Sequence, residues 1–207
     1  MYVEDRAVAE RHAESPRAGV TVVHGDIFRC ADAECMVTAG NSFGMMDGGI
    51  DATTNHRFGK IEPRVQAAIA AAPWRGELPV GAAIVLDAGP TDEHRRFSYL
   101  CYAPTMRTPS ACPRSINAYL AMRGALVACA ASEHAGLIRT IAVPLLCHGV
   151  GRMDADVAIH QIAHARATFA RPVPPRWDAI GDDHHRLHDN VGGEPPRTPS
   201  QWGSESC

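Results

Sequence analysis

The chain has 207 residues and a formal net charge of -3, and 45% of its residues are hydrophobic. The hydrophobic content is ordinary for a globular protein, and the length suits one domain with a tail. The small net charge excludes a strong preference for nucleic acid or for a membrane surface.

The cysteines and the N-terminus indicate the compartment. Seven cysteines occur at irregular spacing, several of them inside apolar runs. This is typical of reduced, buried thiols in a cytosolic protein, and without a Cys-x-x-Cys pair we expect no metal site. The first residues are too charged for a signal peptide, and no apolar run reaches the roughly 18 residues of a membrane span. We therefore expect a soluble, cytoplasmic protein, and a monomer.

Strands and helices are predicted to alternate along the chain. Residues 1–18 are interpreted as an N-terminal extension with a short helix. Strands are expected over 19–24, 33–39, 82–86, 97–102 and 138–146. Helices are expected over 50–58, 62–72, 115–132 and 154–169. Residues 171–207 contain six of the prolines and few apolar residues, so this tail is expected to be disordered.

The apolar strands predict the fold class and the place of the site. Continuous apolar runs indicate strands buried on both faces, which favours a three-layer αβα sandwich with a mixed, largely parallel sheet. In such folds ligands bind beyond the carboxyl ends of the strands. Loops 25–27, 40–51 and 148–151 each follow a predicted strand, so we expect them to gather around one ligand.

The loop after the second strand is the most distinctive stretch. It contains Gly40, Gly44, Gly48 and Gly49, a density that is typical of backbone close to a ligand. Between and after these glycines stand Asn41, Asp47 and Asp51. The pattern predicts a loop that binds phosphate and ribose.

Three motifs, in this order, resemble those of the macro domain family in its bacterial form. The first is Gly25-Asp26-Ile27. The second is Val37-Thr-Ala-Gly-Asn41, followed by Gly48-Gly49-Ile50-Asp51. The third is Ile141-Ala-Val-Pro144, followed by Cys147-His-Gly-Val-Gly151. The resemblance covers residues 19–170 and implies an α/β module that binds ADP-ribose, or an ADP-ribosylated substrate, without a cofactor.

The resemblance also implies roles for individual residues. Asp26, with the Ile27 amide, would bind the adenine amino group, and Asn41 would bind the distal ribose. Asp51 would position or activate water at the anomeric carbon, where an oxocarbenium-like state develops. The diphosphate would lie between two groups of backbone amides, those of Gly48, Gly49 and Ile50 and those of His148, Gly149, Val150 and Gly151.

The chain departs from the family pattern at several positions. Thr38 replaces an asparagine that is usually structural, and Asp47 replaces a loop glycine and adds negative charge. Gly151 replaces an aromatic residue, so that Phe43 becomes a candidate for packing against the distal ribose. These differences predict a divergent member of the family.

Three functions remain open. The spacing of Asn41 and Asp51 favours an enzyme that hydrolyses an ADP-ribosyl bond. A module that binds ADP-ribose or a related nucleotide without turnover is the alternative. Gly40-Asn-Ser42-Phe-Gly44 also matches the nucleophile elbow of serine hydrolases, but the glycines after Ser42 disfavour the helix that an elbow requires.

Overall fold

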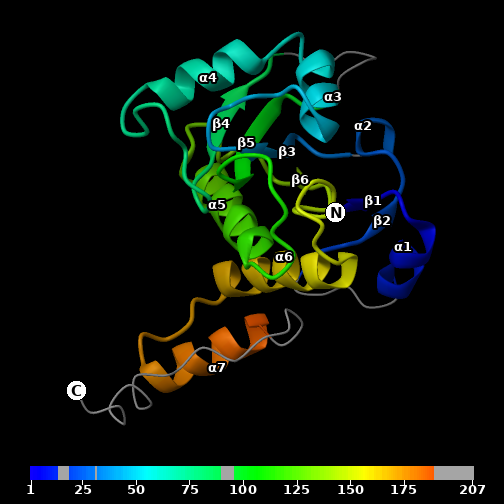
Figure 1. Ribbon diagram of the computed structural model, residues 1–207, viewed down its shortest axis with the longest axis vertical. Helices are drawn as coiled ribbons and strands as arrows, with labels where there is room; N and C mark the ends of the chain where they lie inside the picture. The colour runs from blue at the N-terminus through cyan, green and yellow to red at the C-terminus, as the bar shows by residue number, and fades with distance from the viewer. Residues whose placement is uncertain (14–18, 31, 90–95, 189–207) are drawn as a thin grey trace.

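The computed structural model describes residues 1–13, 19–30, 32–89 and 96–188, and within these residues four strands form a central sheet (Figure 1). In their order across the sheet they are β4 (Ile84–Asp87), β5 (Tyr99–Met106), β3 (Cys35–Asn41) and β6 (Ile141–Ala142). β5, β3 and β6 run parallel, whereas β4 is an antiparallel edge strand. The sheet is therefore mixed and largely parallel, as the sequence predicts.

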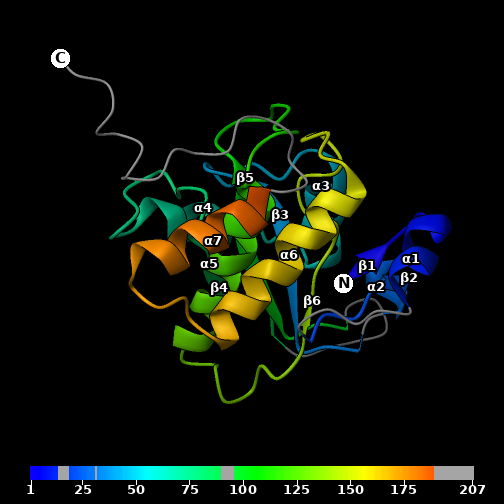
Figure 2. The ribbon, with the colours of Figure 1, turned by 90° about the horizontal axis from the view of Figure 1, so that it is seen from below.

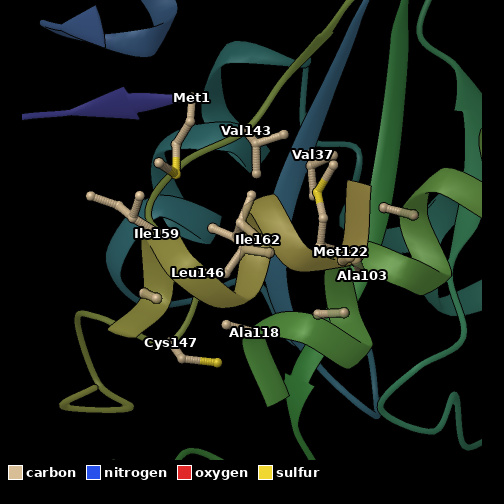
Figure 3. Packing of buried hydrophobic residues seen from close by; sticks show 14 of the residues in the cluster. Met1, Val37, Ala103, Ala118, Met122, Val143, Leu146, Cys147, Ile159 and Ile162 are labelled. Carbon is tan, nitrogen blue, oxygen red and sulfur yellow. The ribbon is translucent and has the colours of Figure 1, made fainter. Parts of the chain in front are cut away.

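Helices cover both faces of this sheet (Figure 1 and Figure 2). The helices of the described residues are α1 (Arg6–Ala13), α2 (Ile27–Cys30), α3 (Gly49–Arg57), α4 (Glu62–Ala70), α5 (Asn117–Ala131), α6 (Ala155–Ala170) and α7 (Trp177–His188). Val37 and Ala103 belong to the core under α5 and α6, which Figure 3 shows. Met36 and Leu100 belong to the opposite core, against α4. Because successive residues of β3 and β5 point into opposite cores, both strands are almost wholly apolar. The expected α/β sandwich is confirmed.

The first residues of the chain are part of this domain and do not form an extension. β1 (Tyr2–Val3) pairs in parallel with β2 (Val23–His24). The Tyr2 N–H donates to the Val143 carbonyl, just after β6, at 2.8 Å, so this pair continues the sheet. Met1 lies near Val143 in the core of Figure 3, and Val3 is buried in the same cluster. Residues 1–13 therefore pack within the domain, in contrast to the expected boundary after residue 18, because β1 bonds to β2 and to Val143 while Met1 and Val3 are buried in the core.

Three strands differ most from the sequence prediction, and one of them is β2, which covers only Val23–His24 of the expected 19–24. β6 covers only Ile141–Ala142 of the expected 138–146, since Val143 bonds to β1 and Pro144 has no N–H for a ladder. β5 continues past the expected end at 102, because its pairing with β3 persists to Met106. No helix within the described ranges is long and apolar enough to cross a membrane.

Part of the tail that was expected to be disordered is helical. α7 lies along α6, where the His164 Nε2 and Asp183 Oδ1 atoms are 3.0 Å apart and Leu187 is buried (Figure 2). Three of the six prolines that suggested disorder precede α7, and the twelve residues Trp177–His188 form an amphipathic helix. Residues 189–207 lie outside the described part of the chain. Within the described part, the histidines of α7 do not belong to a group that could hold a metal ion.

The carboxyl end of β3 is fixed by one side chain of β5. The Tyr102 hydroxyl donates to the Asn41 carbonyl at 2.9 Å and accepts from the Asn41 N–H at 3.0 Å. Its ring crosses β3 at Gly40, where an added Cβ atom would lie 2.1 Å from the Tyr102 Cζ atom. Burial, and then the nearby Asp51 charge, raise the pKa of Tyr102, so the phenol keeps its proton. The register of β3 against β5 shifts between Gly40 and Asn41, and the glycine-rich loop begins there.

Gly40→Ala is expected to destabilise the protein by roughly 2–4 kcal/mol, because the added methyl group must displace the Tyr102 ring and break its hydrogen bonds. Urea unfolding of the variant and the wild type measures this difference. Gly136→Ala is the matched control, because no atom lies within 4 Å of the added Cβ, and its change should stay within about 0.5 kcal/mol. Equal stability of the two variants would contradict the tight crossing.

Candidate functional site

A cleft of about 1010 Å³ opens at the carboxyl ends of β3, β5 and β6. All three loops that the sequence predicted to converge line it. They contribute Gly25 to Phe28, the segment from Ala39 to Asp51 in part, and Pro144 to Gly151 in part. The structure thus brings every predicted binding residue to one cavity, with contacts from loops as far apart in the sequence as residues 25 and 151.

The glycine-rich loop leads directly into α3. Gly48 is the N-cap residue, with extended backbone (φ -141°, ψ 154°) and without a side-chain cap, and Gly49 has a left-handed φ of 55°. The backbone N–H groups of the first helical turn have no partner inside a helix, so they are available to an anion. Gly48 and Gly49 are exposed and line the cleft, and a Cβ atom at either would meet no atom within 4 Å. This is the expected site of a diphosphate group.

Asp51 stands in the first turn of α3 and is buried, with 7% of its surface exposed. The Thr38 hydroxyl donates to its Oδ1 at 2.5 Å. Burial raises the pKa of Asp51 from 3.8 to about 7, the Thr38 hydrogen bond lowers it, and the charge of Asp47 raises it. Near neutral pH this carboxyl group can therefore either accept or donate a proton.

Asn41 is oriented by the loop that follows it. Its Oδ1 accepts from the N–H groups of Phe43 (3.0 Å) and Met45 (3.4 Å), and its Nδ2 donates to the Met45 carbonyl at 2.7 Å. Asn41 lines the cleft, but only one hydrogen of its amide group remains for a ligand. Its main observed contribution is to hold the loop closed, and its role in ribose binding stays a prediction.

The third loop turns sharply at Cys147, whose φ is 64°. The Met153 N–H donates to the Cys147 carbonyl at 3.0 Å, and His148 Nδ1 lies 2.9 Å from the Met153 carbonyl. A Cβ atom on Gly151 would lie 2.3 Å from the Cys147 carbonyl oxygen and 3.0 Å from Cys112 Sγ. The loop conformation therefore requires glycine where the family pattern has an aromatic residue. Cys147 itself is buried, and burial raises the pKa of its thiol, which disfavours a nucleophilic role.

Asp26 lines the cleft from the loop between β2 and α2. Its Oδ1 accepts from the Phe28 N–H at 2.9 Å and thereby begins α2, while Ile27 is buried behind it. Oδ1 is engaged by the backbone, and Asp26 is only partly buried. A carboxylate oxygen can accept two hydrogen bonds or more in total, so Asp26 keeps the capacity to accept from an adenine amino group.

Several residues of the cleft were not predicted from the sequence. Glu4 and Asp5 reach it from the segment between β1 and α1, and Arg57 reaches it from the end of α3. The Arg57 Cζ atom lies 5.8 Å from the centre of the Phe28 ring, which is a cation–π contact. Glu4 and Asp5 were not considered as site residues, because residues 1–18 were interpreted as an extension outside the domain. Helical spacing did not indicate Arg57 either, because a residue six positions after Asp51 does not lie on the same helix face.

Other candidates do not line the cleft. Phe43 packs under Arg107, whose Cζ atom is 5.0 Å from the ring centre, and this position gives no support to the expected contact with the distal ribose. Ser42 is 1% exposed, and α3 begins only at Gly49. A nucleophile elbow needs an accessible serine directly before a helix, so this arrangement does not match one.

Solved structures with a similar fold are macrodomains. The macrodomain of Mycobacterium tuberculosis DarG aligns with a TM-score of 0.58 and 23% identity, over 71% of this chain and 89% of that one. The macrodomain of Thermus aquaticus DarG gives 0.55 and 22%, over 69% and 87%. A glycine-to-valine mutant of the Oceanobacillus iheyensis macrodomain with ADPR gives 0.55 and 15%, over 72% and 76%. No protein-family model and no curated protein matches the sequence. The fold is therefore that of the macrodomain.

The ionisation of Asp51 should make stability depend on pH. Its pKa is higher in the folded chain (about 7) than the ordinary 3.8, so its favourable contribution is complete below pH 4 and is lost as the pH rises through 7. Asp51→Asn should therefore stabilise the protein at pH 8 by on the order of 2–4 kcal/mol, and by much less at pH 4.5.

Urea unfolding at the two pH values measures this effect. The control is Asp182→Asn on the exposed side of α7, which should change stability by less than about 0.5 kcal/mol at either pH. A stability difference between Asp51→Asn and the wild type that does not grow with pH would show that Asp51 ionises normally.

Proposed function

We propose that the chain binds ADP-ribose and hydrolyses an ADP-ribosyl bond, with Asp51 acting on the attacking water. The observation that carries this proposal is a buried, ionisable carboxyl group in the first turn of α3, next to backbone amides in the same cleft. The backbone N–H groups at the start of α3 suit an anion, and the Asp51 carboxyl group in the same cleft can act as an acid or a base. Cleavage of an ADP-ribosyl bond, which lies near a diphosphate, requires both kinds of group.

The binding part of the proposal rests on complementary chemistry along the cleft. Its volume of about 1010 Å³ lies at the upper end of the range of about 300–1,000 Å³ for small-molecule sites. Asp26 would accept from the adenine amino group, and the amides at Gly48 to Ile50 and at His148 to Gly151 would hold the diphosphate. The solved structures support this ligand, since one is described with ADPR and that of Thermosipho africanus DarTG with ADP-ribose.

The catalytic part rests on the charge that develops at the anomeric carbon. Departure of the acceptor leaves an oxocarbenium-like centre, which water attacks. Ionised Asp51 would remove a proton from this water, because its raised pKa makes it a stronger base than an ordinary aspartate. Asn41 would support the site by keeping the loop from Asn41 to Met45 in place. Asp47 is exposed, and its charge strengthens Asp51 as a base.

Replacing Asp51 should separate binding from turnover. Asp51→Ala is expected to retain ADP-ribose binding in calorimetry, while release of ADP-ribose from ADP-ribosylated protein or oligonucleotide falls by about 100-fold or more. Ser42→Ala is the control and should retain activity, because its side chain is buried outside the cleft. If the wild type binds ADP-ribose but releases none from modified substrates, the chain is a binding module. If the wild type does not bind ADP-ribose, both the hydrolase and the binding module are contradicted.

Turnover should increase with pH through the ionisation of Asp51. If the carboxylate is the base, the pH profile of kcat has its acidic midpoint near the pKa of about 7 and levels off above it. The same release assay between pH 5 and pH 9 measures this profile. A rate that falls as pH rises through 7 would instead show that the protonated form of Asp51 is the active one.

A further inference from the structure

The hydroxyl group of Thr38 lies in an otherwise apolar strand. Thr38 is in the middle of β3, opposite Tyr102 of β5, and has no exposed surface. Its neighbours Met36 and Val37 are equally buried and apolar. A buried hydroxyl group costs free energy unless it forms a hydrogen bond, so the partner of Thr38 matters.

The hydrogen of this hydroxyl group is committed to Asp51. The hydroxyl oxygen of Thr54, one turn after Asp51 on α3, lies 3.4 Å from the hydroxyl oxygen of Thr38. Thr54, however, donates its own hydrogen to the Ile50 carbonyl at 2.8 Å. Thr38 donates to Asp51 Oδ1 at 2.5 Å, a length typical of an O–H···O⁻ bond to a charged acceptor.

The contact also joins two elements. Asp51 and Thr54 are the buried residues of α3, and both face Thr38 on β3. The helix that presents its N-terminus to the cleft thus docks on the sheet through hydroxyl and carboxyl groups at this point. The side chains of Thr38, Asp51 and Thr54 therefore determine both the position of α3 and the orientation of the Asp51 carboxyl group.

We infer that Thr38 is a positioning residue, whose hydroxyl group fixes Asp51 Oδ1 and leaves Oδ2 as the oxygen that meets the reacting water in the cleft. This inference rests on the proposed function for its catalytic consequence, but the Thr38–Asp51 contact can be tested without activity. The threonine that departs from the family pattern is then part of the site. Because the bond favours the ionised carboxylate, it opposes the effects of burial and of Asp47 on the Asp51 pKa.

Thr38→Val tests the role, since valine keeps the shape and removes the hydroxyl group. In the full chain, we expect the Asp51 pKa, measured by carboxyl ¹³C NMR titration, to rise by about one unit. The acidic midpoint of kcat should rise by the same amount, and kcat at pH 7 should fall about tenfold or more, with little change in KM. ADP-ribose binding in calorimetry should persist.

Two further variants separate positioning from packing. Thr38→Ser restores the hydroxyl group but lacks the methyl group, and it should bring the NMR and kcat midpoints back towards those of the wild type. Thr168→Val removes a buried threonine hydroxyl group that bonds only within α6, and it should shift neither midpoint.

Unchanged midpoints in Thr38→Val, or equal losses in the valine and serine variants, would overturn the inference. A wild type without turnover would instead count against the proposed hydrolysis. The NMR titration would then still decide whether Thr38 controls the ionisation of Asp51.

Discussion

The double hydrogen bond between Tyr102 and the backbone of Asn41 is the constraint on which the cleft depends. It ends β3 at a defined residue, and the absence of a side chain at Gly40 makes room for the ring. From this point the loop must cover the distance to α3, and the Asn41 side chain closes its first turn. The N-terminus of α3 is consequently held beside the ends of the neighbouring strands, where the other two loops also arrive.

The charged side chains that line the cleft are mostly acidic, although the proposed ligand is an anion. They include Glu4, Asp5, Asp26, Asp47 and Asp51, and few of the lining residues are basic. An anionic ligand would therefore be held mainly by backbone dipoles, which are fixed by the fold and need no counter-charge. Burial, and then the charge of Asp47, raise the pKa of Asp51 to about 7, which keeps this group close to half-ionised at neutral pH. A group in this state costs stability, which is the usual price of a catalytic acid or base.

The sequence allowed the sheet, the helices over it and the convergence of three loops to be predicted, because strand apolarity and glycine spacing reflect local constraints. It did not predict β1, since two residues carry almost no periodicity and their partner lies at Val143. Nor did it predict α7, whose stability comes from contact with α6. At the site, Asp51 and the amides could be located, whereas the bonds of Asn41 and the position of Phe43 depend on side-chain packing that no spacing encodes.

The crowding around Gly151 limits how this loop can change during evolution. A side chain at this position would collide with the Cys147 carbonyl oxygen and with Cys112 Sγ. A single substitution of Gly151 by an aromatic residue is therefore incompatible with the present loop conformation. The turn at Cys147 and the neighbouring segment at Cys112 would have to alter first, and each such step must itself keep the domain folded.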